Sequence, residues 1–331
     1  MATRLALGLV GVGRIGVLHA RTLLALDGVS LTVADADSGR ARKVAAELGI
    51  EAAQTPEELV AGGVDGLVIA TATAGHAPLV RLGVDASVPV FCEKPVALDL
   101  PTMDELVAAA DSAGILVQVG FQRRFDAGYR TLRDAVANGS VGRILAMRAA
   151  THDPYPPAEE YLAASGGIFR DLHIHDFDAI RFVSGDEIVE VYADGSALET
   201  HWLEQYGDVD VAAAVLRLAG GGLVILSGTR HDPLGYDVRL EVFGTKDSLV
   251  AGLDERTPLA GRPGPAYRDF WDRFEPAYRA ELETFVTSIR TGRKSACSLD
   301  EARSALRVAL AADRSLAEHQ PVALAKAPPN G

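Results

Sequence analysis

One segment of the chain, Gly166–Asp178, carries a carboxylate and an imidazole at a spacing that suits proton transfer. Asp171 and His175 are four residues apart, so a continuous helix would present both on one face. Histidine titrates near neutral pH, and a carboxylate beside it orients the ring and favours the imidazolium that forms when it takes a proton. We therefore predict that His175 is a general base and that Asp171 is its partner.

Two other interpretations of this segment stay open. Asp171, His173 and His175 are residue types that bind metal ions. On a helix, however, residues two apart point about 200° from each other, so His173 and His175 would not converge. The pair could also be a structural histidine beside a salt-bridging carboxylate.

Lys94 stands between a predicted buried strand, Val88–Cys92, and Pro95. A lysine at the carboxyl end of a strand can hold a substrate hydroxyl. Its charge would stabilise the negative charge that develops on that oxygen when a hydride leaves the neighbouring carbon. Pro95 stiffens the turn that aims the side chain. The alternative is a solvated lysine paired with Glu93.

A glycine-rich turn lies near the start of the chain. The apolar strand Leu5–Val10 runs directly into a segment that consists of Gly11, Val12, Gly13, Arg14, Ile15 and Gly16. Gly11 allows the tight turn, Gly13 lets the backbone approach a pyrophosphate, and Gly16 lets helix and strand pack closely. The free N–H groups of the following helix suit phosphates. In this strand–turn–helix context the spacing predicts a dinucleotide site.

A second apolar strand, Val29–Ala34, ends on Asp35. A carboxylate at this place accepts hydrogen bonds from the adenosine ribose and would repel a 2′-phosphate. Asp35 therefore predicts NAD rather than NADP as the cofactor. The arginines Arg40 and Arg42 weaken the expected preference for NAD over NADP.

Strand and helix signals alternate up to about residue 120, which is typical of a doubly wound parallel sheet. Ligands of such sheets bind at the carboxyl ends of the strands. Three further residues fall at those ends and are predicted to border the cofactor: Thr71, His76 and Glu93.

Beyond residue 120 the pattern changes to helices followed by short alternating strands, which predicts an α+β domain with a largely antiparallel sheet. Helices are predicted over Asp126–Asn138 and Gly167–Val183, and the triplet at 220–222, all glycine, predicts a hairpin turn. We therefore expect two domains, residues 1–120 and residues 121–331.

The composition limits the partners. The net charge of −13 argues against nucleic acid or an anionic membrane surface, and we see no apolar run long enough to cross a membrane. No export signal is evident at the N-terminus. The sequence has two cysteines, Cys92 and Cys297, which is too few for a disulfide framework and favours the reducing cytoplasm.

Taken together, three motifs resemble the family of glucose–fructose oxidoreductase, inositol dehydrogenase and MocA. They are the glycine turn followed by His19-Ala20, the tripeptide Glu93-Lys94-Pro95, and the segment 166–178. The resemblance covers nearly the whole chain. It implies an NAD-binding Rossmann domain and an α+β domain whose open sheet forms a dimer or tetramer. It also assigns Lys94, Asp171 and His175 as the catalytic group.

Within this family the chain is most similar to inositol 2-dehydrogenases. The similarity implies that Arg124, Asp153 and Tyr236 border a polyol substrate together with the catalytic group. Polyol recognition needs many such donors and acceptors, because each buried hydroxyl left unpaired is costly. His152 and His173 depart from the expected pattern, and they leave the identity of the sugar open.

The expected function is reversible NAD-dependent oxidation of a secondary hydroxyl on a cyclitol such as myo-inositol. Other functions considered are a dehydrogenase of a pyranose or anhydrosugar, an NAD-dependent glycosidase, and an NAD-sensing binding protein. The catalytic group speaks against a sensor, which needs no base.

Overall fold

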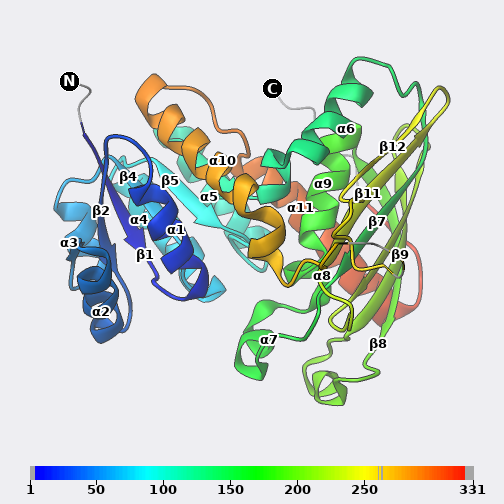
Figure 1. The fold of residues 1–331 in the computed structure, drawn as a ribbon, viewed down its shortest axis with the longest axis horizontal. Helices are drawn as coiled ribbons and strands as arrows, with labels where there is room; N and C mark the ends of the chain where they lie inside the picture. The colour runs from blue at the N-terminus through cyan, green and yellow to red at the C-terminus, as the bar shows by residue number, and fades with distance from the viewer. Residues whose placement is uncertain (1–3, 260, 262–263, 325–331) are drawn as a thin grey trace. The chain divides into compact units, whose positions relative to one another are not determined.

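The computed structural model describes residues 4–259, 261 and 264–324, which form two compact units (Figure 1). The first unit contains the chain up to Gln122 together with Tyr278–Arg303, and the second contains Arg123–Ala277 and the chain from Ser304 onward. The sequence pattern predicts two domains, at residues 1–120 and 121–331. In the structure the chain first crosses between the units after Gln122, and 278–303 belongs to the first unit. No local sequence pattern signals that return.

The first unit is built on a parallel sheet of six strands in the order β3-β2-β1-β4-β5-β6. The strands are β1 (Leu5–Val10), β2 (Val29–Ala34), β3 (Glu51–Ala52), β4 (Gly66–Ile69), β5 (Val90–Glu93) and β6 (Val117–Gly120). This is the doubly wound sheet that the alternating pattern predicts. The two-residue strand β3 was not predicted.

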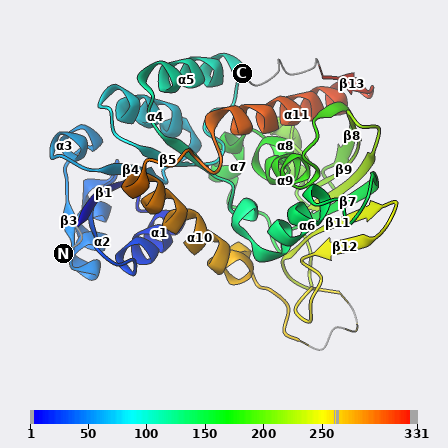
Figure 2. The same cartoon turned by 90° about the horizontal axis from the view of Figure 1, so that it is seen from above.

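Helices cover both faces of this sheet, with α4 and α5 on one side and α1, α2 and the end of α10 on the other (Figure 2). Their bounds are α1 (Arg14–Leu24), α2 (Ser38–Leu48), α3 (Pro56–Ala61), α4 (His76–Asp85), α5 (Leu100–Ala113) and α10 (Phe270–Thr291). The late residues Leu282, Phe285 and Val286 belong to the same apolar core as β1, β2 and α1. Burial of that core explains why α10 completes this unit.

The second unit contains a seven-stranded sheet in the order β12-β11-β7-β10-β9-β8-β13. Its strands are β7 (Ile144–His152), β8 (Ile188–Ser196), β9 (Val211–Leu218), β10 (Leu223–Thr229), β11 (Asp237–Gly244), β12 (Ser248–Ala251) and β13 (Val322–Ala323). Within the described part, β7 and β10 pair in parallel and the other pairs are antiparallel. The prediction of a largely antiparallel sheet is confirmed.

Helices pack against one face of this second sheet (Figure 1). The helices of the unit are α6 (Ala127–Ala137), α7 (Glu159–Ser165), α8 (Ile168–Asp171), α9 (Ile174–Ser184) and α11 (Leu299–Glu318), whose first turn belongs to the first unit. The strands alternate buried and exposed residues, and the exposed positions of the other face include Val215, Leu223 and Ile225. That face is more apolar than a solvated sheet requires.

No helix in the described ranges is both long and apolar enough to span a bilayer.

The glycine turn gives the first prediction. A Cβ on Gly16 would lie 1.9 Å from the carbonyl oxygen of Gly11, whereas a Cβ on Gly13 would meet nothing within 4 Å. The Gly16→Ala variant must shift the turn backbone, so its Tm should fall by at least about 2 °C. Gly13→Ala is the matched control, and its Tm should stay closer to that of the unmodified protein. Equal Tm values for the two variants would contradict this account of the turn.

Candidate functional site

The N-terminus of α1 is open to an anion. Its first residues Gly13 and Arg14 are exposed, no side chain caps it, and its first turn contains no acidic residue. Gly11 has a φ of +94°, which a side chain would strain. The helix therefore directs the N–H groups of its first turn and its positive dipole end toward solvent, as a phosphate site requires.

Asp35 lies beside this turn, as predicted. One of its carboxylate oxygens accepts a hydrogen bond from the Val12 N–H at 2.8 Å, and the other accepts from the Asp37 N–H at 2.8 Å and from Arg40 Nη2 at 2.7 Å. Burial alone would raise its pKa, but these hydrogen bonds more than offset it and hold the pKa below its ordinary value. Asp35 is therefore an ionised acceptor at a fixed place next to the turn.

His76 joins the carboxyl ends of two strands. Its Nδ1 lies 2.7 Å from the carbonyl oxygen of Pro95, and its Nε2 lies 3.0 Å from that of Thr71. The ring is 2% exposed, and burial lowers its pKa. These contacts give His76 a structural task, which is to hold the segment after Lys94 against the end of β4. Its predicted contact with the cofactor stays a prediction.

Glu93 and Lys94 stand at the end of β5, as the strand pattern predicts. Lys94 is half-buried. The Glu93 carboxylate is buried, and its Oε1 lies 2.6 Å from His19 Nε2. The segment that carries Lys94 is thus fixed on one side by His19 and on the other by His76.

In the second unit the predicted continuous helix over Gly167–Val183 is wrong. Helix α8 ends at Asp171, and α9 begins at Ile174. The break arises because the His173 N–H bonds to the carbonyl of Ile168, five residues back, instead of continuing the four-residue ladder. Asp171 and His175 therefore flank a turn, and the argument from a shared helix face does not hold.

The carboxylate of Asp171 is held by two donors. Tyr161 donates its hydroxyl to Oδ1 at 2.7 Å, and Arg230 Nη1 lies 3.2 Å from Oδ2. The charge of Asp171, burial and the hydrogen bond together raise the pKa of Tyr161 far above its ordinary value, so the phenol stays a donor. Asp171 is therefore an oriented carboxylate, as a partner of a base must be.

Arg230 is fully buried, and its counter-ions come from two places. Besides Asp171, its Nη2 lies 3.9 Å from Asp208 Oδ2. Burial would lower the pKa of Arg230, but the charges of these two carboxylates raise it above its ordinary value. Asp208 Oδ1 in turn accepts from the Ile168 N–H at 2.8 Å, which fixes the start of α8.

His173 belongs to a different buried network. Its Nδ1 lies 2.8 Å from Asp176, which also bonds Arg123 at 2.5 Å and Thr151 at 2.8 Å. Burial works against the charge of Asp176, but Arg123 and His173 lower its pKa below the ordinary value. Within the described ranges, the group whose His and carboxylate atoms lie within 4.8 Å of one another is His19, Glu93 and Glu281. It is not the set of Asp171, His173 and His175 that the metal interpretation requires.

The predicted substrate residues lie in the second unit with varied surroundings. Arg124 is 8% exposed and forms a paired contact with Asp178, from Nε at 2.8 Å and from Nη2 at 2.6 Å. Asp153 is half-buried, and Tyr236 is 5% exposed with its ring edge-on to Phe274. Burial and then the charge of Asp153 raise the pKa of Tyr236. Their contact with a substrate stays a prediction.

Sequence reasoning missed the two residues that hold Asp171. Arg230 is 59 positions away along the chain, and no motif announces it. The one available signal is its place directly after the strand β10. Tyr161 lies ten residues before Asp171, and no motif in the sequence assigns it a role.

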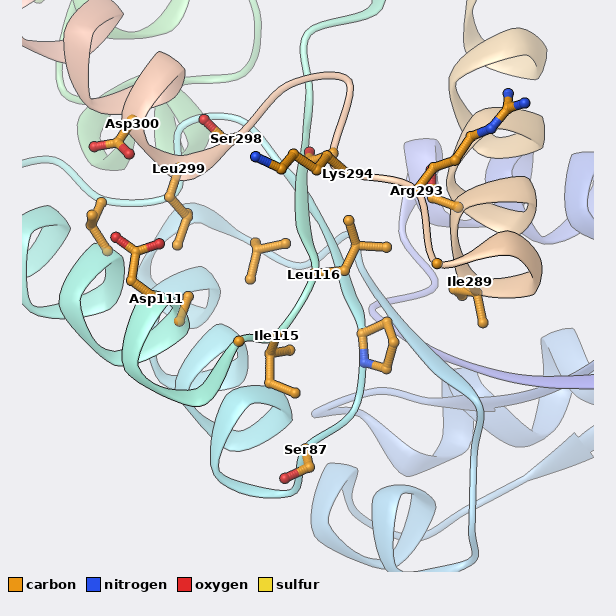
Figure 3. Close-up of a pocket in the computed structure, with 18 residues that line it drawn as sticks. Ser87, Asp111, Ile115, Leu116, Ile289, Arg293, Lys294, Ser298, Leu299 and Asp300 are labelled. Atoms are coloured by element: carbon orange, nitrogen blue, oxygen red, sulfur yellow. The ribbon is translucent and has the colours of Figure 1, made fainter. Parts of the chain in front are cut away.

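A pocket of 710 Å³ lies elsewhere in the first unit (Figure 3). Pro89 and Leu116, which precede β5 and β6, belong to its lining, so it is at the amino ends of these strands. Figure 3 shows Lys294 extending across it toward Ser298 and Arg293 turned away. None of the predicted site residues lines it.

The residues of the first unit fit a dinucleotide. Open space lies where a Cβ on Gly13 would stand, the α1 N-terminus is uncapped, and Asp35 is ionised beside the turn. A pyrophosphate needs the first two features, and a ribose diol needs the third.

Comparison with known proteins agrees with this geometry. Residues 5–121 match the oxidoreductase family with an NAD-binding Rossmann fold, and residues 129–250 match the GFO/IDH/MocA C-terminal domain. A myo-inositol dehydrogenase of Streptomyces leeuwenhoekii, Hyg17, is 42% identical over 94% of this chain and 97% of its own length. A myo-inositol 2-dehydrogenase of Thermotoga maritima is 37% identical over 96% and 98%.

Solved structures show the same architecture. A scyllo-inositol dehydrogenase of Lactobacillus casei, solved with bound NAD(H) and scyllo-inositol, superposes with a TM-score of 0.89 at 28% identity. The superposition covers 97% of this chain and 99% of that one. The protein binds NAD and is an oxidoreductase: the chain belongs to the GFO/IDH/MocA family.

Proposed function

We propose that the protein oxidises a secondary hydroxyl group of an inositol or a closely related cyclitol to the ketone, reversibly, with NAD as the oxidant. The observation that carries the chemistry is the Asp171 carboxylate, which hydrogen bonds from Tyr161 and Arg230 orient four residues before His175. The substrate class is supported by the near full-length similarity to relatives named for inositol.

Three side chains divide the work. Lys94 donates a hydrogen bond to the reacting hydroxyl and stabilises the negative charge that grows on its oxygen. His175 takes the hydroxyl proton, and Asp171 stabilises the imidazolium that results. Bound NAD supplies the acceptor for the hydride that leaves the carbon.

The units take different roles in this proposal. The first unit holds NAD through the turn Gly11–Gly16 and through Asp35, with Thr71, His76 and Glu93 at the same strand ends. The second unit supplies Asp171 and His175, and Arg124, Asp153 and Tyr236 border the polyol. Its sheet also joins the protomers.

We further propose that the protein is a homodimer or homotetramer and that it works in the cytoplasm. Apolar side chains on the uncovered face of the second sheet support the assembly, with Val215 49% and Ile225 54% exposed. Both cysteines are buried and neither forms a disulfide, which suits a reducing compartment.

The substrate and the catalytic group can be tested in one assay. Inositol isomers, pyranoses and anhydrosugars are offered with NAD, and NADH absorbance is recorded. An inositol should give the highest kcat/KM. With that substrate His175→Ala should lose on the order of 10²–10⁴-fold in kcat while NAD binding persists, since the loss falls on proton transfer. Lys94→Ala should lower kcat/KM deeply as well.

In the oxidative direction kcat/KM should rise with pH while His175 titrates, because the base must start neutral. Normal turnover by His175→Ala would remove it from the mechanism. A preference for a pyranose would replace the substrate class but leave the reaction intact. Cleavage of a glycoside without net NADH would point to a glycosidase.

Asp35 makes the cofactor preference testable. The unmodified protein should use NAD with a much higher kcat/KM than NADP, because the ionised Asp35 repels a 2′-phosphate. Asp35→Ser should lower the ratio of kcat/KM with NAD to kcat/KM with NADP. Arg40, which pairs with Asp35 at 2.7 Å, could then bind the 2′-phosphate of NADP. Steady-state kinetics with both cofactors measure this. Equal use of NAD and NADP by the unmodified protein would contradict it.

Assembly is measured by light scattering. We expect a dimer or tetramer at micromolar concentration, and Ile225→Lys should shift it toward the protomer because a charge on the apolar face must lose its hydration. A mass of 34.9 kDa for the unmodified protein would refute the proposal.

A further inference from the structure

A cluster of three titratable side chains lies in the first unit and includes Glu93, the residue directly before Lys94. It comprises His19 of α1, Glu93 of β5 and Glu281 of α10, whose polar atoms lie within 4.8 Å of one another. His19 and Glu281 are 0% exposed, and Glu93 is 8% exposed. The reaction described above uses neither His19 nor Glu281.

Glu281 is the unusual member. Neither of its carboxyl oxygens has a hydrogen-bond partner among the described residues. A buried carboxylate without partners is so costly that the group takes up a proton instead. Burial and then the charge of Glu93 raise the pKa of Glu281 well above its ordinary value.

Contacts with neighbouring elements nevertheless hold the backbone of Glu281 in place. Gln118 of β6 donates its side-chain amide to the Glu281 backbone carbonyl at 2.8 Å, which ties α10 to the sheet. On the other side of the cluster, the rings of Phe91 and Tyr278 lie 5.7 Å and 5.9 Å from the His19 ring. The titratable groups around Glu281 are thus His19 from α1, Glu93 from β5 and Tyr278 from its own helix.

We propose that Glu281 is a neutral carboxylic acid that donates its proton toward the Glu93 carboxylate, and that the chain Glu281–Glu93–His19 positions Lys94. Glu93 receives hydrogen bonds from two sides in this arrangement, from His19 Nε2 at 2.6 Å and from the acid. One water between Glu281 and Glu93 can relay the hydrogen bond from the acid to the carboxylate. The positioning of Lys94 rests on the proposed function, whereas the neutral state of Glu281 does not.

The same three residue types could hold a divalent cation, but the contact between His19 and Glu93 favours the proton. At 2.6 Å a hydrogen lies between His19 Nε2 and Glu93 Oε1, so both atoms are engaged in this hydrogen bond. A metal would need both lone pairs for itself. The experiment below separates the two possibilities.

The neutral state predicts the sign of a pH effect. Because the pKa of Glu281 is higher in the folded than in the unfolded chain, its stability contribution is complete below its unfolded pKa of about 4.5 and is lost as pH rises toward its folded pKa. Glu281→Gln replaces the acid by a neutral group that can still donate. At pH 8 this variant should have a Tm above that of the unmodified protein by on the order of 2–5 °C, and the gap should close toward pH 5.

Glu283→Gln is the matched control. Glu283 stands two residues further along α10, is exposed and pairs with Arg279 at 2.7 Å. Its Tm difference from the unmodified protein should be small and should not grow with pH in this way. If Glu281→Gln is less stable than the unmodified protein at every pH, the carboxyl group is ionised and the proposal falls. Stoichiometric zinc or manganese in the purified protein that Glu281→Gln loses would equally overturn it.

Activity tests the positioning of Lys94. Glu281→Gln should keep kcat near normal because the amide can donate to Glu93, whereas Glu281→Leu should lower kcat several-fold with little change in the KM for NAD. Equal kcat for the two variants would refute the positioning role. If the leucine variant does not fold, the pH dependence of Glu281→Gln still decides the neutral state. If Lys94→Ala is fully active, the proposed function fails. The Tm comparison does not measure activity, so it still tests the neutral state of Glu281.

Discussion

The second unit depends on the rule that a buried charge must have a counter-charge. Four of its described arginines are at most 8% exposed: Arg123, Arg124, Arg181 and Arg230. Desolvating a guanidinium costs several kcal/mol unless a carboxylate lies against it. Their carboxylate partners are, in this order, Asp176, Asp178, Glu187, and Asp171 with Asp208. Two acidic residues of this short segment, Asp176 and Asp178, anchor α9 to the chain before α6. Asp171 pairs instead with Arg230, four residues before the proposed base His175.

At the end of β5, contacts within the first unit hold the backbone that carries Lys94. A lysine on a loop has many rotamers, and its backbone must be fixed before the side chain can be aimed. Two histidines do this from opposite sides, His76 through the carbonyl of Pro95 and His19 through the carboxylate of Glu93. Neither imidazole need exchange a proton with a substrate. His19 and His76 therefore serve to hold the backbone around Lys94 in place.

Local rules explain which features could be predicted. The glycine turn and the place of Asp35 depend on neighbours in the chain, and the structure has them where the pattern puts them. The break between α8 and α9 comes with the hydrogen bond from the His173 N–H to the Ile168 carbonyl, which helical periodicity does not predict. Arg230 and Glu281 were beyond reach for a similar reason: each acquires its role from a residue far away in the chain.

Helix α10 lies on both sides of the division between the units, which falls at Ala277 and Tyr278. The core of the first unit needs Leu282, Phe285 and Val286, which are made late. During synthesis the first six strands therefore leave the ribosome long before α10, which completes the cover that α1 and α2 begin on one face (Figure 2). The nascent sheet must keep an apolar surface exposed while the whole second unit is translated, and it closes only near the end of the chain. Chaperone demand and sensitivity to C-terminal truncation are thus built into the order of the sequence, independently of any catalytic residue.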